Sequence, residues 1–287
     1  MSVFVMKLIA VLSMITDHLG YFLSPLYIPR GVYYVMRSIG RIAFPVYCFL
    51  IVNGYEKTHD VKGYLTRLVT FAAISQVPFV LTFDANPYIP GLGLSVTTLY
   101  APWLCLGLLA VVAAGWLLGV QRDGSVLWPV LALGLGIVTL RFDGVKLLSE
   151  EMNVFYTLAL GLAAVAVLDH ALRPARDFKR LIPQALALAA ALLLVRDYAD
   201  YRCLGIALIV ALYLCRERRW TQALMIGLWV AAEYILPGMR LSYIVCAALG
   251  MVPVLLYNGK LGKPMKRIFY WIYPLHLLIL GILTQLS

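Results

Sequence analysis

Charged residues are scarce in this sequence. Asp, Glu, Lys and Arg make up 13% of its 287 residues, whereas hydrophobic residues make up 62%. A soluble domain is nearer one quarter charged and one half apolar, so a water-soluble fold would have no place for this apolar surface. Apolar runs long enough to cross about 30 Å of hydrocarbon recur along the whole chain. We therefore expect residues 1–287 to form a single membrane domain.

Several motifs that would indicate another class of protein are missing. The five cysteines form no CxxC pair and have no histidine at metal-ligand spacing, so we expect neither disulfides nor a metal site. There is no Gly-rich phosphate loop and no internal repeat. The net charge of +10 comes from basic residues scattered over short loops, so nucleic-acid binding is not expected. The first apolar segment, residues 4–23, lacks a small-residue cleavage site, which predicts a retained helix rather than a signal peptide.

The apolar runs predict an all-α, polytopic transmembrane helix bundle of about eleven spans. The runs are solidly apolar over about 15 to 20 residues, whereas the strands of a transmembrane barrel alternate over about ten. Two short spans, 181–195 and 202–215, alternatively form one broken helix or re-entrant segments. We place the spans at residues 4–23, 33–53, 63–83, 98–119, 125–141, 152–169, 181–195, 202–215, 219–236, 241–257 and 267–286.

The positions of Lys and Arg in the loops predict the orientation, because cytoplasmic loops carry the excess of these residues. The predicted outer side receives Arg30, Arg141, Lys146, Arg196, Arg202 and Arg240. The inner side receives Lys7, Lys57, Lys62, Arg67, Arg122, Arg173, Arg176, Lys179, Arg180, Arg216, Arg218, Arg219, Lys260, Lys263, Lys266 and Arg267. We therefore expect an N-in, C-out protein of the bacterial cytoplasmic membrane. The outer loop 84–96, rich in Pro and Gly, is predicted to be ordered, either as an entrance or as a connector.

Ionisable residues inside the predicted spans are the candidates for a functional site. A rise of about 1.5 Å per residue places Asp17 and His18 about 20 Å, Arg41 about 18 Å and His276 about 14 Å from the cytoplasmic edge. Such groups cost several kcal/mol unless they pair or face water. Arg37 and Arg41 are four residues apart and share a helix face, so the Asp17 carboxylate can pair with either. The alternative is a purely structural pair that joins two helices.

The two histidines in these spans have different predicted roles. Histidine transfers protons near neutral pH, which makes His18 a candidate catalytic base. Asp17 and His18 are adjacent and about 100° apart around a helix, so a triad-like contact between them is not expected. Pro274, two residues before His276, loosens the helix and leaves a carbonyl for the His276 ring to bond. His276 is therefore either a substrate-binding residue or a satisfied core histidine.

At these residues the chain resembles the TraX family of membrane acetyltransferases, and the DHLG and GRIAFP segments are the most specific part of the likeness. The matching pieces are KLIAVLSMITDHLGYF (7–22), RSIGRIAFPVYCFLIVNGY (37–55), YLTRLVTFAAISQVPF (64–79), NVFYTLALGL (153–162), DYADYRCLGIALIVALYL (197–214) and FYWIYPLHLLIL (269–280). The resemblance implies transfer of an acetyl group from acetyl-CoA. Residues 84–151 depart from the family pattern, and the acceptor, a protein N-terminal amine or an envelope glycan, stays open.

Acyl transfer needs a base for the acceptor and positive charge where the thioester oxygen becomes negative. His18 and Arg41 fit these roles, and Asp17 is the third candidate catalytic residue, which would orient a neighbour. Arg37 is a candidate substrate-binding residue that either assists electrostatically or pairs with Asp17. Asn153 and Asp197 are weaker candidates for acceptor binding, the alternative being that they cap or join helices. The predicted binders of the acetyl-CoA phosphates are Lys57, Arg67, Lys266 and Arg267, although these residues would serve equally to set the orientation. The rival classes are a transporter or flippase with a polar site near the midplane, and a noncatalytic envelope assembly subunit.

Overall fold

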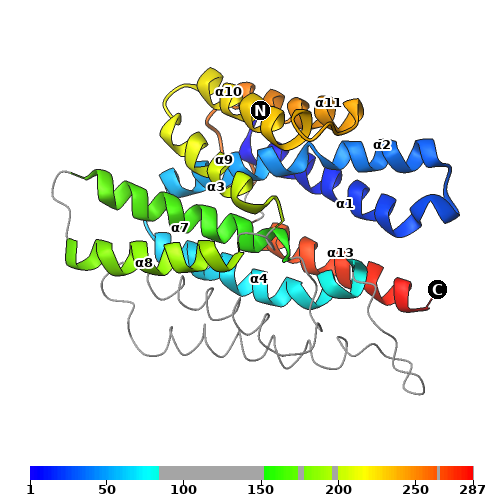
Figure 1. Cartoon of the computed structure of the whole chain (residues 1–287), viewed down its shortest axis with the longest axis horizontal. Helices are drawn as coiled ribbons and strands as arrows, with labels where there is room; N and C mark the ends of the chain where they lie inside the picture. The colour runs from blue at the N-terminus through cyan, green and yellow to red at the C-terminus, as the bar shows by residue number, and fades with distance from the viewer. Residues whose placement is uncertain (84–151, 174–177, 196–199, 264–265, 287) are drawn as a thin grey trace, which may run out of the picture. The chain divides into compact units, whose positions relative to one another are not determined.

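Every secondary-structure element that the computed structural model describes is helical (Figure 1). The description covers residues 1–83, 152–173, 178–195, 200–263 and 266–286. The elements are α1 (Val3–Tyr27), α2 (Arg30–Gly40), α3 (Ala43–Lys57), α4 (Val61–Phe83), α7 (Val154–Leu172), α8 (Phe178–Val195), α9 (Arg202–Leu214), α10 (Arg219–Val230), the π-helix η2 (Ala231–Ile235), α11 (Leu241–Leu249), α12 (Met251–Leu255) and α13 (Lys266–Leu286).

Four stretches of the described residues are helical, long and apolar enough to cross a bilayer, so the chain is a membrane protein. They are Val3–Ser24, Arg30–Lys57, Val61–Phe83 and Val154–Leu172. Shorter apolar stretches of 10–17 residues among the described residues are Arg202–Leu214, Leu241–Leu255 and Ile268–Thr284. The 13 residues of α9 extend only about 20 Å at 1.5 Å per residue. The total of about eleven spans therefore stays a prediction, and the predicted spans 98–119 and 125–141 lie outside the described residues together with the loop 84–96.

The chain divides into two compact units. The first unit comprises Met1–Glu56 with Ala207–His276, and the second comprises Lys57–Ile206 with Leu277–Ser287. Helices α9 and α13 contribute residues to both. Within the second unit α7 packs against α4 and α8 (Figure 1), and Ala159, Leu160, Leu162 and Ala163 of α7 are completely buried.

Three helix ends of the first unit lie together. The Met1 amine donates to the Leu256 carbonyl, and the Asn258 N–H donates to the Met1 carbonyl at 3.0 Å. The rings of Phe4 and Phe269 meet edge to face, with centroids 6.0 Å apart. The start of α1, the end of α12 and the start of α13 therefore share one end of this unit. Which end faces the cytoplasm stays a prediction from the charge of the loops.

The predicted span 33–53 lies within the helical stretch Arg30–Lys57, which is interrupted between α2 and α3. Helix α2 ends at Gly40 and α3 begins at Ala43. The cause is Pro45, because it has no N–H to donate to the carbonyl of Arg41 and its ring crowds that carbonyl. Arg41 consequently lies at a break between two helices rather than within a regular turn.

A second interruption divides the predicted span 241–257 at Gly250, between α11 and α12. Pro253 lacks the N–H that would bond the Leu249 carbonyl, four residues before it, so the helix is weakest there. A Cβ at Gly250 would overlap the ring of Pro45. The two interruptions are therefore packed against each other, which a larger residue than glycine at position 250 would prevent.

Helices α1 and α2 lie side by side in close contact (Figure 1). A Cβ at Gly20 of α1 would lie 2.8 Å from the Cβ of Met36, and a Cβ at Gly40 of α2 would overlap the side chain of Asp17. Small residues let two helix backbones approach in a membrane, where no hydrophobic effect drives them together. The glycines thus bring Asp17 directly against the end of α2.

Candidate functional site

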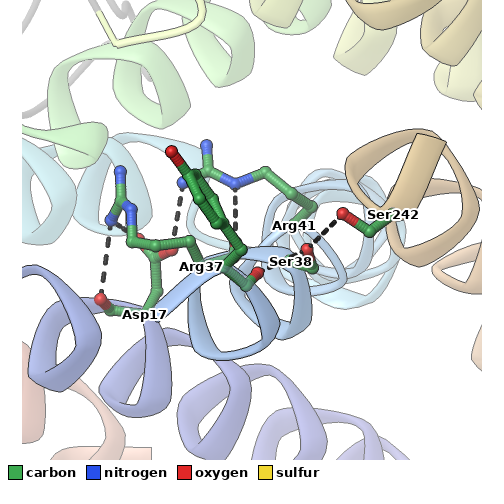
Figure 2. A network of polar contacts seen from close by, with 6 residues as sticks. Asp17, Arg37, Ser38, Arg41 and Ser242 are labelled. Carbon is green, nitrogen blue, oxygen red and sulfur yellow. Dashed lines mark hydrogen bonds and ion pairs between the residues drawn. The ribbon is translucent and has the colours of Figure 1, made fainter. Parts of the chain in front are cut away.

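The Asp17 carboxylate lies between two guanidinium groups (Figure 2). Its Oδ2 is 2.6 Å from Arg37 Nη1, and its Oδ1 is 3.0 Å from Arg41 Nη2. The three side chains are 13%, 19% and 17% exposed. The expected ion pair is confirmed, and the carboxylate pairs with both arginines rather than with one. Since one negative charge faces two positive charges, the Asp17–Arg37–Arg41 cluster keeps a net positive charge.

Further contacts hold the two arginines in place. Arg41 Nε donates to the main-chain carbonyl of Arg37 at 3.1 Å. The Arg37 guanidinium lies 5.4 Å from the ring centroid of Tyr21, and that of Arg41 lies 5.5 Å from the ring centroid of Tyr243. Both distances are within the range of a cation–π interaction. The guanidinium groups therefore have fixed orientations, which favours a preorganised site for negative charge.

Helix α11 contacts α2 next to this cluster through a hydrogen bond between two serines (Figure 2). The hydroxyl oxygens of Ser38 and Ser242 are 2.9 Å apart, and Ser38 Oγ is 2.6 Å from the Tyr34 carbonyl oxygen. A serine has one hydroxyl hydrogen and the carbonyl can only accept, so Ser38 donates to Tyr34 and Ser242 donates to Ser38. Arg240 lies 3.6 Å from the ring centroid of Tyr34. These contacts, which the sequence did not reveal, fix α11 against α2.

The two histidines of the predicted spans are in direct contact. Nδ1 of His18 is 2.6 Å from Nε2 of His276. The ring planes are 8° apart and the centroids 4.9 Å apart. The nitrogen–nitrogen distance is shorter than the centroid–centroid distance by about the sum of the two ring radii. This is possible only if both nitrogens lie on the line that joins the two centroids. The rings are therefore nearly coplanar and meet edge to edge, as an in-line hydrogen bond requires.

His276 is also bonded to the main chain. Its Nδ1 is 2.7 Å from the carbonyl oxygen of Ile272, which belongs to the same helix. The carbonyl that Pro274 leaves without its N–H partner is that of Tyr270, four residues before the proline, so the partner is not the carbonyl that was predicted. Both histidines have the ring of Tyr273 beside them, at centroid distances of 6.0 and 5.6 Å. The sequence placed His18 and His276 at similar depths but did not reveal that α1 and α13 are neighbours.

Consecutive residues of α1 thus point to different partners. Asp17 binds the arginines at the junction of α2 and α3, whereas His18 binds His276 on the first half of α13. This agrees with the expectation that Asp17 and His18 do not pair, because adjacent residues are about 100° apart around a helix. The arrangement provides a proton acceptor and a net positive group at one level of one helix.

Asn153, one of the two weaker candidates for acceptor binding, makes structural contacts. Asn153 belongs to the second unit, where its Oδ1 accepts from Phe155 N–H at 3.1 Å and caps α7. Its Nδ2 donates to the Ala72 carbonyl at 2.8 Å and to Gln76 Oε1 at 2.7 Å, which joins α7 to α4. Asn153 therefore makes the structural contacts named as the alternative. Asp197 lies outside the described residues.

The residues expected to bind the acetyl-CoA phosphates are distributed over both units. Lys57 ends α3, and Arg67 on α4 lies 5.9 Å from the ring centroid of Tyr64; both belong to the second unit. Lys266 and Arg267 open α13 in the first unit, and their side chains are not described.

A second basic group lies in the first unit; its residues were placed on the inner side from the sequence but were not singled out as phosphate binders. The Arg219 guanidinium is 5.2 Å from the ring centroid of Phe49 and 5.0 Å from that of Tyr257. Arg216 Nε is 3.8 Å from a Glu56 carboxylate oxygen. Tyr257 directly follows Leu256, which bonds Met1, so this group lies at the end where α1 begins. The run of Arg216, Arg218 and Arg219 is visible in the sequence, but the aromatic rings beside it are not.

The fold and the site define a helical membrane protein with ionisable groups buried between its apolar helices. The chain belongs to the TraX family, since the family model described as TraX protein matches residues 2–143 and 135–284. The match includes residues 84–151, which were expected from the sequence to depart from the family pattern.

Two relatives extend this finding. The chain is 25% identical to the probable fimbrial assembly protein FimC, serogroup H1, of Dichelobacter nodosus, over 97% of this chain and 94% of the relative. It is 35% identical to an uncharacterized protein of Rickettsia prowazekii (strain Madrid E), over 27% of each chain. No solved structure matches.

Proposed function

We propose that this protein is a membrane-embedded acetyltransferase that moves an acetyl group from cytosolic acetyl-CoA to an acceptor on the outer side of the membrane. The observation that carries the proposal is the position of two consecutive residues of α1. His18 is bonded to His276, and Asp17 beside it belongs to a cluster with net positive charge. Acyl transfer requires both, a base and a stabiliser of the developing oxyanion. Membership of the TraX family supports the same chemistry, because the resemblance to this family of membrane acetyltransferases implies transfer from acetyl-CoA.

In the proposed step the acceptor amine attacks the thioester carbonyl carbon of acetyl-CoA. The N–C bond forms, the C–S bond breaks, and His18 takes the proton that the amine loses. The same proton is then delivered to the thiolate of CoA, so that the amide and the free thiol are the products. The positive charge left by Arg37 and Arg41 stabilises the tetrahedral oxyanion, and Asp17 keeps both guanidiniums oriented.

The nucleotide end of acetyl-CoA carries phosphates, and several basic residues are available to bind it. Arg216 and Arg219 lie at the end of the first unit where α1 begins. The predicted binders Lys57, Arg67, Lys266 and Arg267 are retained as further candidates. Phosphate contacts made equally in the ground and transition states lower KM for acetyl-CoA without raising kcat.

The printed name of one relative, rather than the site, supports the choice of acceptor. A fimbrial assembly protein aligns with nearly the whole chain, and an acetylated pilin-type subunit, modified at its N-terminal amine, fits both that name and the proposed step. An envelope glycan is the alternative acceptor, attacked through a hydroxyl group by the same mechanism.

Radiolabelled acetyl-CoA supplied to proteoliposomes with a pilin-type subunit tests the proposal. We expect the subunit to become labelled by the wild-type protein, and the His18→Ala variant to lose about a hundredfold or more of the rate. His59→Ala is the matched control, because His59 is exposed and has no proposed role. Accumulation of an unmodified solute in the vesicle lumen without covalent labelling would instead establish a transporter. Equal rates for wild type and His18→Ala would refute the assigned base.

A further inference from the structure

The hydrogen bonds of His276 determine where its hydrogens are. The carbonyl oxygen of Ile272 can only accept, so Nδ1 of His276, 2.7 Å away, carries a hydrogen. In a neutral imidazole the other nitrogen then bears the lone pair. Nε2 of His276 is therefore an acceptor, and it faces Nδ1 of His18 at 2.6 Å.

The same reasoning applies to His18. Because Nε2 of His276 accepts, Nδ1 of His18 must donate, and this assigns its hydrogen. A neutral His18 with a hydrogen on Nδ1 has its lone pair on Nε2. The chain that runs from the Ile272 carbonyl through His276 to His18 thus selects one tautomer of His18 and leaves Nε2 as its basic nitrogen.

We infer that His276 is a positioning residue that holds His18 in the Nδ1–H tautomer, with Nε2 as the atom that takes the proton of the acceptor. The inference rests on the proposed function for the role of His18. When Nε2 takes up a proton, Nδ1–H still donates to His276, so no hydrogen bond between the rings is lost during transfer. The near-coplanar rings also restrict rotation of the His18 imidazole, because rotation would take Nδ1 off the line to His276. An orienting partner of this kind is a recurrent feature of catalytic bases.

Nitrogen NMR of protein labelled with ¹⁵N-histidine tests the tautomer without any reference to activity. The chain has four histidines, so His59→Gln and His170→Gln variants assign the remaining signals to His18 and His276. At a pH where both rings are neutral, we expect each to carry its hydrogen on Nδ1 and its lone pair on Nε2. A hydrogen on Nε2 of His18, or hydrogens on both nitrogens of His276, would overturn the inference even if acetyl transfer were established.

Two substitutions of nearly equal polarity test the positioning role. The amide of His276→Gln reaches about as far as Nε2 and can accept from His18, whereas that of His276→Asn reaches about as far as Nδ1 and can only approach Ile272. We expect His276→Asn to lower kcat on the order of a hundredfold with KM for acetyl-CoA unchanged, and His276→Gln to recover part of that loss.

The variants also separate positioning from packing. In His276→Asn the His18 signals should show a mixture of tautomers, and in His276→Gln mainly the Nδ1–H form. Equal kcat losses in the two variants, accompanied by equal falls in thermal stability and an unchanged His18 tautomer, would mean that His276 is only a packing residue. Absence of transfer by the wild-type protein would refute the proposed function while leaving the tautomer measurement valid.

Discussion

The buried Asp17–Arg37–Arg41 cluster stabilises the protein only when all three side chains are present. Asp17 neutralises half of the positive charge of Arg37 and Arg41, and all three side chains are largely buried. Removing one member of a buried ion pair leaves a charge without compensation, which is far more costly than replacing the whole set. The cluster therefore links the stability of the first unit to the electrostatics that the proposed reaction needs.

For this reason we expect Asp17→Asn to destabilise the protein by on the order of 3 kcal/mol and to abolish transfer. Thermal unfolding in detergent measures the first effect and the radiolabel assay the second. Asp169→Asn is the matched control, since Asp169 pairs with Arg173 at a similar distance, 2.6 Å, in a pair whose arginine is 66% exposed. An exposed pair of this kind contributes about 0–1 kcal/mol. Equal losses of stability in the two variants would contradict the role given to burial.

For single residues, the sequence predicted the ionisable side chains of the candidate site but not all of their partners. Depth along a helix can be calculated from residue numbers, and it placed Asp17 level with Arg41, where the ion pair is found. Neighbouring helices cannot be calculated in the same way. The contact of His18 with His276 joins residues 258 positions apart, and no periodicity in a single sequence indicates that pairing.

Two glycines on α2 differ in how closely other atoms approach them. Gly40 faces Asp17 so closely that any side chain there would displace the carboxylate, whereas a Cβ added at Gly31, on the same helix, would have no neighbouring atom within 4 Å. Neither glycine has a positive φ, so any difference between substitutions at the two positions reports on packing rather than on backbone strain.

We expect Gly40→Ala to lower the melting temperature and to reduce transfer, because the methyl group pushes Asp17 away from Arg37 and Arg41. Gly31→Ala should be neutral or stabilising, since alanine is favoured over glycine in helices by about 0.5–1 kcal/mol. Circular dichroism melts of the two variants, together with their transfer rates, provide the comparison. If Gly40→Ala were as stable and as active as Gly31→Ala, the close approach of α1 and α2 would not be needed for the site.

The elements themselves were largely predictable, and their irregularities were not. Solid apolar runs gave the helices of both units within a few residues, as in α1 and α7. The break before Ala43 and the interruption at Gly250 depend on which carbonyl each proline leaves unbonded and on what packs against it. Proline within an apolar run permits a kink in a membrane helix but does not require one, as α13 shows by continuing through Pro274.

At the scale of the whole molecule, the positions of the basic residues and of the candidate site bear on the side of the membrane from which each substrate approaches. Arg216 and Arg219 lie at the end of the first unit where α1 begins, and Asp17 and His18 lie about fifteen residues further along that helix, roughly 20 Å away at 1.5 Å per residue. The excess of Lys and Arg predicts that the first end is cytoplasmic. A charged nucleotide does not enter hydrocarbon, whereas the long, thin arm that carries the thioester can extend between helices.

These observations lead us to expect that donor and acceptor approach from opposite sides of the membrane. In sealed vesicles of one orientation, acetyl-CoA supplied only to the cytoplasmic face should acetylate an impermeant acceptor peptide confined to the other face. Arg219→Gln should raise KM for acetyl-CoA with little change in kcat, because it removes a contact made equally in the ground and transition states. Lys179→Gln is the control, since Lys179 is an exposed basic residue of the second unit. Labelling observed only when donor and acceptor share the cytoplasmic compartment would contradict transfer across the membrane. In that case His18 would have to be reached by both substrates from the end where α1 begins, and acetylation would be a reaction of the inner face.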